Sequence, residues 1–153
     1  MEKVKMNFIE RDHKFEITID DNEWHERLGP TRYFICRQAG TERPYTGEYE
    51  TTVEKGIYYS AATLDPLFDS SDKFDSGCGW PSFTKPIHED AVVYREDLSH
   101  GMHRIEVLDA RSGSHLGHVF NDGPAPTGLR YCINSAALIF VKEGEEKPKY
   151  KPF

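Results

Sequence analysis

The chain has 153 residues, a length typical of one domain, and its 37% hydrophobic and 29% charged residues indicate a folded globular protein rather than a disordered one. Its formal net charge of −7 disfavours nucleic acid as a partner, because phosphate binding needs a basic face. No apolar run approaches the roughly 20 residues that a membrane helix needs, and the N-terminus lacks the apolar core of a signal peptide. We therefore expect a cytoplasmic protein that binds neither membrane nor nucleic acid.

Residues 1–19 predict an extended leader whose last six residues alternate between polar and apolar, as a strand does. Two short helices are expected next. Asp20, with Glu23 three positions later, resembles a capping box that begins the first helix. Pro30 suits the first position of the second helix, and Gly40 suits its end.

After these helices the pattern favours short strands, because glycine and proline divide the sequence and β-branched and aromatic residues lie between them. The candidate strands are residues 56–61, 91–96, 103–108, 117–120, 129–132 and 136–141. Residues 143–153 are charged and contain proline, which is typical of a frayed tail. No linker divides the chain, so residues 1–153 are expected to form a single domain.

The three cysteines are Cys36, Cys78 and Cys132, and this odd, low count argues against a secreted disulfide scaffold. In a reducing compartment a free cysteine is structural, metal-binding or catalytic. Cys36 lies in the second predicted helix, where we expect a buried structural residue.

Cys78 lies between two glycines in residues 76–83 (SGCGWPSF), and Trp80 follows two positions later. Glycine relaxes the allowed backbone angles, so this cysteine is expected on a mobile, exposed loop. One interpretation is a tight turn with an aromatic plug. The other is a redox cysteine beside an aromatic wall that receives a ligand.

Residues 115–120 (HLGHVF) carry two histidines three positions apart. On a regular strand, His115 and His118 would face opposite sides, so they can share a site only if Gly117 allows a bend or a bulge. The pair is compatible with a metal site, a structural pair or a catalytic pair.

Alternation along residues 130–135 (RYCINS) places Arg130, Cys132 and Asn134 on one face of a strand. A cysteine on this polar face is a better candidate for a lowered pKa than one in an apolar core. The alternative is a small side chain packed within a sheet, which is the commonest role of a free cysteine.

Taken together, these segments resemble one family, the methionine-R-sulfoxide reductases, or B-type peptide methionine sulfoxide reductases. The match runs from about Trp24 to Val141 and is most specific in residues 40–49, 73–83, 115–120 and 130–137. The resemblance implies a mainly β fold of two antiparallel sheets with short N-terminal helices, of the β-tent or Mss4-like barrel type.

The resemblance also implies the chemistry: reduction of methionine-R-sulfoxide in oxidised proteins. Cys132 matches the nucleophile that attacks the sulfoxide sulfur, and Cys78 matches the resolving cysteine that closes a disulfide, which thioredoxin then reopens. The matching substrate pocket consists of Trp80, His115, His118, Phe120 and Asn134.

Within that pocket, a sulfoxide is electrophilic only when its oxygen receives a proton or a hydrogen bond. We expect His118 to supply the proton, with His115 as its nearest competitor, because imidazole titrates near neutral pH. Asn134 would donate to the oxygen or hold a histidine. Trp80 and Phe120 would form an apolar wall that excludes water.

The sequence departs from the family pattern at four positions where many members carry zinc-binding cysteines. They are occupied here by Ser60, Thr63, Asp109 and Ser112. Because structural zinc is normally bound by cysteine and histidine, we predict no zinc and no other cofactor. Hydrogen bonds among these four side chains are expected in place of the metal.

Two other functions remain as alternatives. A metal-dependent enzyme or metal-binding module could be built on His115, His118 and Cys132, but it would have no use for Trp80, Cys78 or Asn134. A non-catalytic protein-binding module could use the same scaffold, although the two cysteines argue against it. Activity in the presence of a chelator, and thiol titration with methionine sulfoxide, would distinguish these functions.

Overall fold

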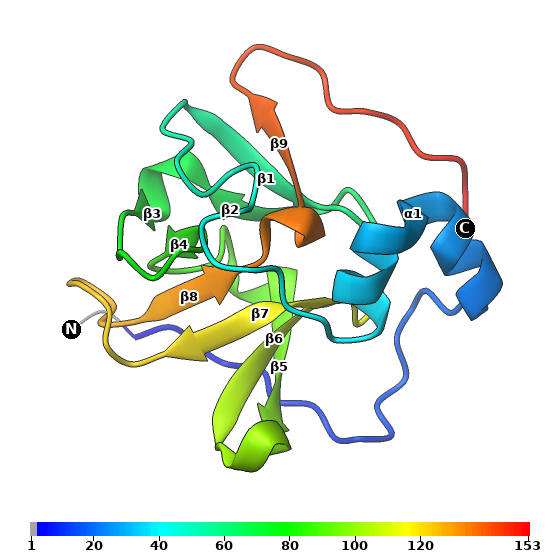
Figure 1. The fold of residues 1–153 in the computed structure, drawn as a ribbon, viewed down its shortest axis with the longest axis horizontal. Coiled ribbons are helices and arrows are strands. Elements are labelled where there is room, and N and C mark those ends of the chain that lie inside the picture. The colour runs from blue at the N-terminus through cyan, green and yellow to red at the C-terminus, as the bar shows by residue number, and fades with distance from the viewer. Residues whose placement is uncertain (1–2) are drawn as a thin grey trace.

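The computed structural model describes residues 3–153, which form nine strands, one kinked α-helix and four single-turn 3-10 helices (Figure 1). The smaller sheet has the order β2-β1-β9, with β1 at Gly56–Ser60, β2 at Pro66–Asp69 and β9 at Leu138–Lys142. The larger sheet has the order β3-β4-β8-β7-β6-β5, with β3 at Lys73–Phe74, β4 at Ser82–Phe83, β5 at Val92–Asp97, β6 at Arg104–Asp109, β7 at His115–Phe120 and β8 at Arg130–Ile133.

All strand pairs within these two sheets are antiparallel, so the predicted mainly β fold of two antiparallel sheets is confirmed. Among residues 3–153 there is no closed barrel, because β2 and β9 end one sheet while β3 and β5 end the other. The six predicted strands all form, with bounds that differ by at most two residues. Strands β2, β3 and β4 were not predicted, since two of them are only two residues long and the third begins with a proline.

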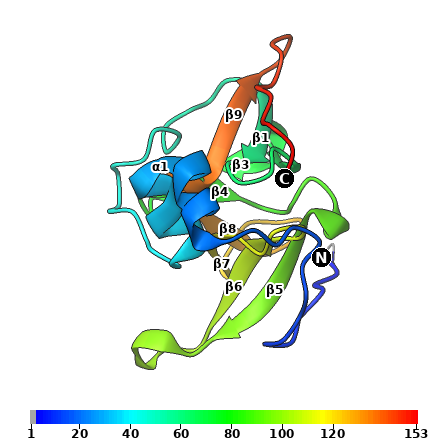
Figure 2. The same cartoon turned by 90° about the vertical axis from the view of Figure 1, so that its right-hand side faces the viewer.

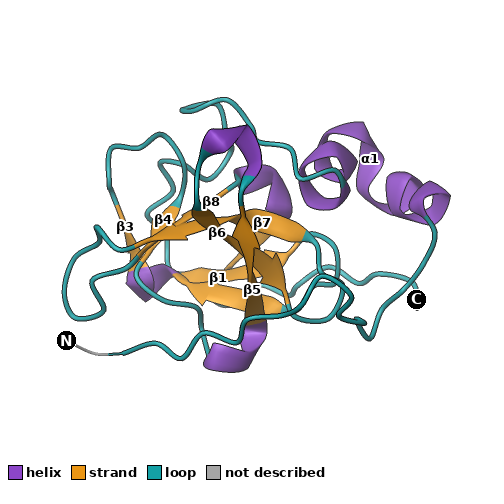
Figure 3. Ribbon diagram, turned by 90° about the horizontal axis from the view of Figure 1, so that it is seen from below, coloured by secondary structure: helices purple, strands orange, loops and turns teal. Residues whose placement is uncertain are grey.

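Helix α1 (Asp21–Arg37) begins as its sequence predicts, since the Asp20 side chain accepts a hydrogen bond from the Glu23 backbone N–H at 2.8 Å. Gly29, with φ 77°, interrupts it before Pro30, so two helical segments meet at a kink (Figure 3). The second segment ends at Arg37, three residues earlier than Gly40. No helix within residues 3–153 is long and apolar enough to cross a membrane.

The leader is extended, but the strand predicted within residues 14–19 is wrong. The backbone there faces a turn rather than a strand, and the Ile17 N–H donates to the Arg111 carbonyl at 3.0 Å. The leader instead makes a short parallel bridge earlier, where Phe8 pairs with Tyr94 at the edge of β5 (Figure 2).

The C-terminal tail, which the sequence predicts to fray, has no helix or strand but contacts the rest of the fold. It returns from β9 to α1 (Figure 1), where the Arg27 guanidinium lies 4.4 Å from the centre of the Phe153 ring. The Tyr150 hydroxyl donates to the Ala61 carbonyl at 2.8 Å. These contacts hold the tail against both the helix and the turn after β1.

The core lies between the two sheets and is rich in aromatic side chains. Phe68 of β2 stacks on Phe83 of β4, with ring centres 4.4 Å apart, and Tyr58 of β1 contacts Phe83 edge to face. Tyr94 and Tyr131 are fully buried, and their hydroxyls hydrogen bond to each other at 2.7 Å. Because side chains alternate along a strand, the residues between these core positions point to the other face of the larger sheet.

Candidate active site

Strand register places a row of polar side chains on that other face. His118 of β7 pairs with Glu106 of β6 on one side and with Cys132 of β8 on the other. Cys132 in turn pairs with Ser82 of β4. Residues directly opposite on neighbouring antiparallel strands lie on the same face, with Cβ atoms about 4.5–5.5 Å apart. The His118 side chain therefore lies between those of Glu106 and Cys132 on this face of the sheet.

A β-bulge brings the second histidine to the same region. Val107 pairs with Gly117 and Leu108 with His115, which leaves Leu116 as an extra residue in β7. The ring centres of His115 and His118 are 5.5 Å apart. The sequence predicted that the two histidines could share a site only with a bend or bulge near Gly117, and the structure has this bulge. A Cβ at Gly117 would overlap the Cys132 carbonyl oxygen, so this close approach of β7 and β8 requires glycine.

The thiols of Cys78 and Cys132 are neighbours, with their sulfur atoms 3.3 Å apart. The Ser82 hydroxyl lies 3.4 Å from the Cys78 sulfur, and the Cys78 backbone N–H donates to the Ser76 hydroxyl. Burial opposes ionisation of Cys78, but hydrogen bonds, first those of Ser76 and Ser82, lower its pKa to about 7. Cys78 is therefore the more acidic thiol of the pair.

Cys132 has the opposite electrostatics. Its pKa is raised, first by burial and then by the hydrogen bond and negative charge of Cys78, whereas Arg130 acts to lower it. The lowered Cys132 pKa expected from the sequence is therefore wrong for this arrangement of the two thiols. The main reason is burial of Cys132, and the adjacent Cys78 adds to it because two neighbouring thiols do not readily ionise together.

Each histidine is bound by a carboxylate. His118 Nε2 lies 2.7 Å from Asp97 Oδ2, and His115 Nδ1 lies 2.6 Å from Glu106 Oε2. Burial lowers the pKa of His118, and Asp97 opposes this shift. His118 thus has Nδ1 left for other partners. His115 Nε2 is buried and has no hydrogen-bond partner among the residues that the structure describes.

A cavity of about 300 Å³ opens over the two thiols. Six of the seven expected site residues line it: Cys78, Trp80, His118, Phe120, Cys132 and Asn134. His115 does not line the cavity and is only 3% exposed. The Trp80 indole is fixed by a hydrogen bond of 3.0 Å to the Glu42 carbonyl, and the Arg130 guanidinium covers the Phe120 ring at 4.5 Å. The cavity thus combines two thiols, one imidazole and two aromatic walls.

The Asn134 amide is engaged at both ends. Its Nδ2 donates to the Leu116 carbonyl at 3.0 Å, and its Oδ1 accepts from the Glu42 backbone N–H at 3.0 Å. Neither contact reaches a histidine ring; the amide instead binds the backbone of β7, the strand that carries both histidines.

The sequence interpretation missed several residues at the site. Asp97 and Glu106 bind the histidines, Glu42 fixes Trp80, and Arg104 lines the cavity. Glu42 lies within the matching segment 40–49 but was not singled out, and the other three lie outside the four segments. Strand register was the only information that could have placed Asp97 and Glu106 beside the histidines.

The four positions that many family members use for zinc lie away from this cavity. Ser60 donates to Asp109 at 3.0 Å, and the Ser112 hydroxyl donates to both Asp109 oxygens at 2.9 and 2.8 Å. Thr63 contributes only its backbone N–H, which donates to the Ser60 hydroxyl. The Thr63 hydroxyl instead accepts a hydrogen bond from the Asp65 backbone N–H. The expected hydrogen-bond network thus forms among three of the four side chains, and the absence of zinc stays a prediction.

Comparison with known proteins identifies the family. A SelR domain matches residues 28–142. The chain belongs to the SelR family, which contains the B-type methionine sulfoxide reductases. SelR relatives named "Peptide methionine sulfoxide reductase MsrB" include one from Pseudomonas savastanoi pv. phaseolicola, 57% identical over 119 residues that span 78% of this chain and 91% of the relative. Another, from Alteromonas mediterranea, is 49% identical over 140 residues, which is 92% of this chain and 97% of the relative.

The arrangement of side chains also bears on the alternative of a metal site. Within residues 3–153, no three His, Cys, Asp or Glu side chains converge as metal ligands would. One ring nitrogen of His115 and one of His118 are instead bound to carboxylates.

Proposed function

We propose that this SelR member reduces methionine-R-sulfoxide in proteins, with Cys132 as the nucleophile, Cys78 as the resolving thiol and thioredoxin as the reductant. The observation that carries the proposal is the pair of thiols, 3.3 Å apart, beside a cavity that is lined by an indole and an imidazole. The preference for the R epimer and the use of thioredoxin come from the family resemblance.

Substrate binding uses the aromatic wall. The methyl group of the sulfoxide packs on Trp80, with Phe120 completing an apolar surface that excludes water. This position directs the sulfoxide sulfur toward Cys132 and its oxygen toward His118, because these two residues are cross-strand neighbours.

The first chemical step needs a thiolate at Cys132. With the sulfurs 3.3 Å apart, the Cys132 proton passes to the Cys78 thiolate, and the charge left on Cys132 is stabilised by Arg130. Cys132 attacks the sulfoxide while His118 gives a proton to its oxygen. The bond from oxygen to the methionine sulfur breaks, the substrate sulfur is reduced by two electrons, and Cys132 is oxidised to a sulfenic acid.

The second step closes a disulfide. The Cys78 thiol condenses with the Cys132 sulfenic acid, which forms the sulfur–sulfur bond and releases the oxygen as water. The sulfurs need to approach by little more than 1 Å, since a disulfide measures about 2.05 Å. The dithiol of thioredoxin then reduces this disulfide by thiol–disulfide exchange.

Mass spectrometry of the protein after a single turnover tests the assignment. The reduced chain should acquire a Cys78–Cys132 disulfide and release one methionine. Cys132→Ser should abolish sulfoxide reduction. Cys78→Ser should release one methionine per enzyme and then stall with thioredoxin. Cys36→Ser is the matched control and should recycle normally, because Cys36 is 2% exposed and its pKa is raised to about 12 by burial.

Normal recycling by Cys78→Ser would contradict the role of this residue as the resolving thiol and would direct attention to Cys36. Full activity in Cys132→Ser would overturn the proposed function itself.

A further inference from the structure

The two histidine–carboxylate pairs differ in their relation to the substrate cavity. His118 lines the cavity and is bound through Nε2, so its free ring nitrogen is Nδ1. His115 is bound through Nδ1 and lies behind His118. Neither Asp97 nor Glu106 lines the substrate cavity. The carboxylates can therefore influence the reaction only through the side chains they bind, which for Asp97 are His118 and, at the cavity wall, Arg104.

We propose that Asp97 is a positioning residue for sulfoxide reduction: it holds His118 Nε2 so that Nδ1 faces the cavity as the proton donor. This inference rests on the proposed function. A carboxylate that accepts a hydrogen bond from one ring nitrogen fixes the tautomer and the ring orientation, and it stabilises the imidazolium that carries the transferable proton.

Asp97 is itself held firmly enough to do this. Its Oδ1 accepts hydrogen bonds from the Ser99 backbone N–H at 2.9 Å and the Ser99 hydroxyl at 2.6 Å. Its Oδ2, which contacts His118, also accepts from Arg104 at 3.2 Å. Burial acts to raise the pKa of Asp97, but the hydrogen bonds of Ser99 and His118 outweigh it and hold the pKa well below its usual range. The carboxylate therefore stays ionised wherever the enzyme works.

Charged and titratable groups from every neighbouring element face His118. They are Asp97 of β5, Arg104 and Glu106 of β6, His115 of β7, Arg130 and Cys132 of β8, and Cys78 of the loop before β4. Burial, Arg104 and His115 all favour the neutral imidazole. Asp97 is the group that hydrogen bonds to the ring and favours the cation, so the proton on His118 depends on it.

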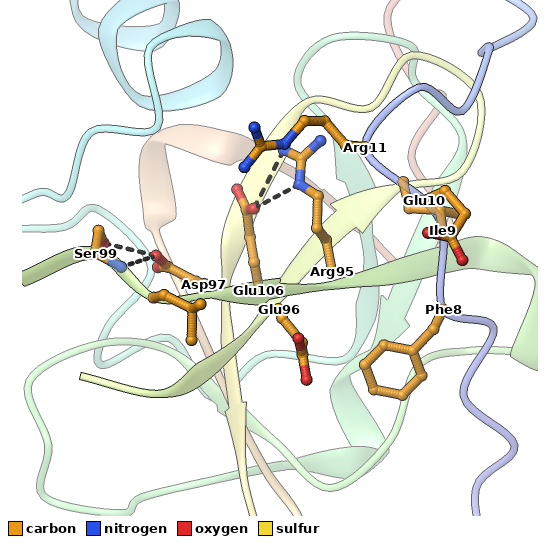
Figure 4. A pocket seen from close by; sticks show the side chains of 10 residues that line it. Phe8, Ile9, Glu10, Arg11, Arg95, Glu96, Asp97, Ser99 and Glu106 are labelled. Carbon is orange, nitrogen blue, oxygen red and sulfur yellow. Dashed lines mark hydrogen bonds and ion pairs between the residues drawn. The ribbon is translucent and has the colours of Figure 1, made fainter. Parts of the chain in front are cut away.

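A second cavity, of about 810 Å³, is lined by the two carboxylates themselves (Figure 4). The leader residues Phe8 to Arg11 form one wall, and Asp97 and Glu106 lie in the opposite wall, where Arg95 binds Glu106. A substitution at Asp97 therefore removes no side chain from the substrate cavity and acts on it only through His118 and Arg104.

Asp97→Asn tests the inference, with two readouts. In the reduced protein, NMR titration of the His118 ring should give a lower pKa than in the wild type, because the counter-charge is gone. In single-turnover assays, the rate should fall roughly 10- to 100-fold near pH 7. The fall in rate with rising pH, which follows loss of the imidazolium proton, should move to lower pH. The KM should change less than twofold, and Asp97→Glu should recover part of the rate.

Glu96→Gln is the matched control. Glu96 is the neighbouring carboxylate of β5, but its side chain is 65% exposed and its ion-pair partner is His103, at 3.4 Å. This variant should match the wild type in both readouts.

An unchanged His118 pKa and pH profile in Asp97→Asn would overturn the inference. A rate loss with an unshifted profile would also overturn it, because that pattern indicates a merely structural role. Either result is distinct from failure of the proposed function, which would be seen as activity in Cys132→Ser.

Discussion

The larger sheet buries polar groups in two regions: the Asp109 end, where β6 ends, and the Cys132 end, which faces the substrate cavity. The two regions use their polar groups differently. At one end, Asp109 is 1% exposed, and Ser60 and Ser112 satisfy both of its oxygens. At the other end, around Cys132, two thiols share one site, and a histidine nitrogen is buried without a partner among residues 3–153.

This difference separates stability from reactivity. A buried polar network whose members are all hydrogen bonded rigidifies a fold and has no capacity left for a ligand. Groups that are held in place but incompletely paired can bind or exchange protons with a substrate. We therefore expect substitutions at the Asp109 end to change mainly the free energy of unfolding, and those at the Cys132 end to change mainly reactivity.

The largest effect on stability is expected for Asp109→Ala. Loss of the carboxylate leaves the Ser60 hydroxyl and two Ser112 donors buried without their acceptor, which should cost about 3–4 kcal/mol of unfolding free energy. Urea denaturation would measure the loss. Asp109→Asn, which keeps the shape and one acceptor, should lose less. The comparison fails if folded Asp109→Ala differs clearly from the wild type in the reactivity of its thiols.

Gly117→Ala should affect both properties, because a methyl group there overlaps the Cys132 carbonyl. Separation of β7 from β8 should cost about 1–3 kcal/mol. It should also slow single-turnover reduction about 100-fold, since His118 and Cys132 no longer align. Gly144→Ala is a useful control, because its added Cβ meets no atom within 4 Å, although its positive φ carries some strain. Wild-type activity in Gly117→Ala would show that the register is less critical than we infer.

Thiol reactivity should change with pH as the pKa of Cys78 dictates. Its thiolate forms as the pH rises through about 7, so iodoacetamide should alkylate Cys78 before Cys132, with a midpoint near pH 7. Ser82→Ala removes one hydrogen bond to the thiolate and should move the midpoint upward, toward the ordinary value of 9.0. Peptide mapping of the alkylated protein shows which cysteine is labelled first. Earlier labelling of Cys132 would contradict our assignment of the thiolate to Cys78.

The smallest effect is expected for Arg111→Ala. Arg111 links Glu16 of the leader, at 2.9 Å, to Asp65 after the β1 turn, also at 2.9 Å, but its side chain is 41% exposed. Exposed ion pairs contribute about 0–1 kcal/mol each, and less at high salt. Thermal unfolding at two salt concentrations would show this, with Lys142→Ala as a comparable surface variant. A loss above about 2 kcal/mol would mean that the ion pairs, rather than the Asp109 network, hold this end together.

The sequence predicted the elements and motifs that depend on local patterns. The Asp20 cap, the break before Pro30, six strands and the bulge required near Gly117 all follow from residues close together in the chain. The family motifs likewise indicated which cysteines and histidines to examine.

The sequence did not predict features that depend on pairing between distant segments. Asp97 lies 21 positions from His118 and meets it only through the register of three strands. The raised pKa of Cys132 depends first on its burial and then on the proximity of Cys78, 54 positions earlier in the chain. The prediction of a strand at residues 14–19 was wrong for the same reason, because alternation is typical of a strand but does not show which strand it would pair with.

The short separation between the two sulfurs has a consequence for enzyme survival. Peroxide that reaches Cys132 directly would produce the same sulfenic acid that we propose for the catalytic cycle, and a second oxidation would convert it irreversibly to sulfinic acid. With Cys78 only 3.3 Å away, closure of the proposed disulfide is intramolecular and should outpace that second oxidation. The oxidising conditions that damage methionine would thus leave this protein in a form that a cellular dithiol can restore.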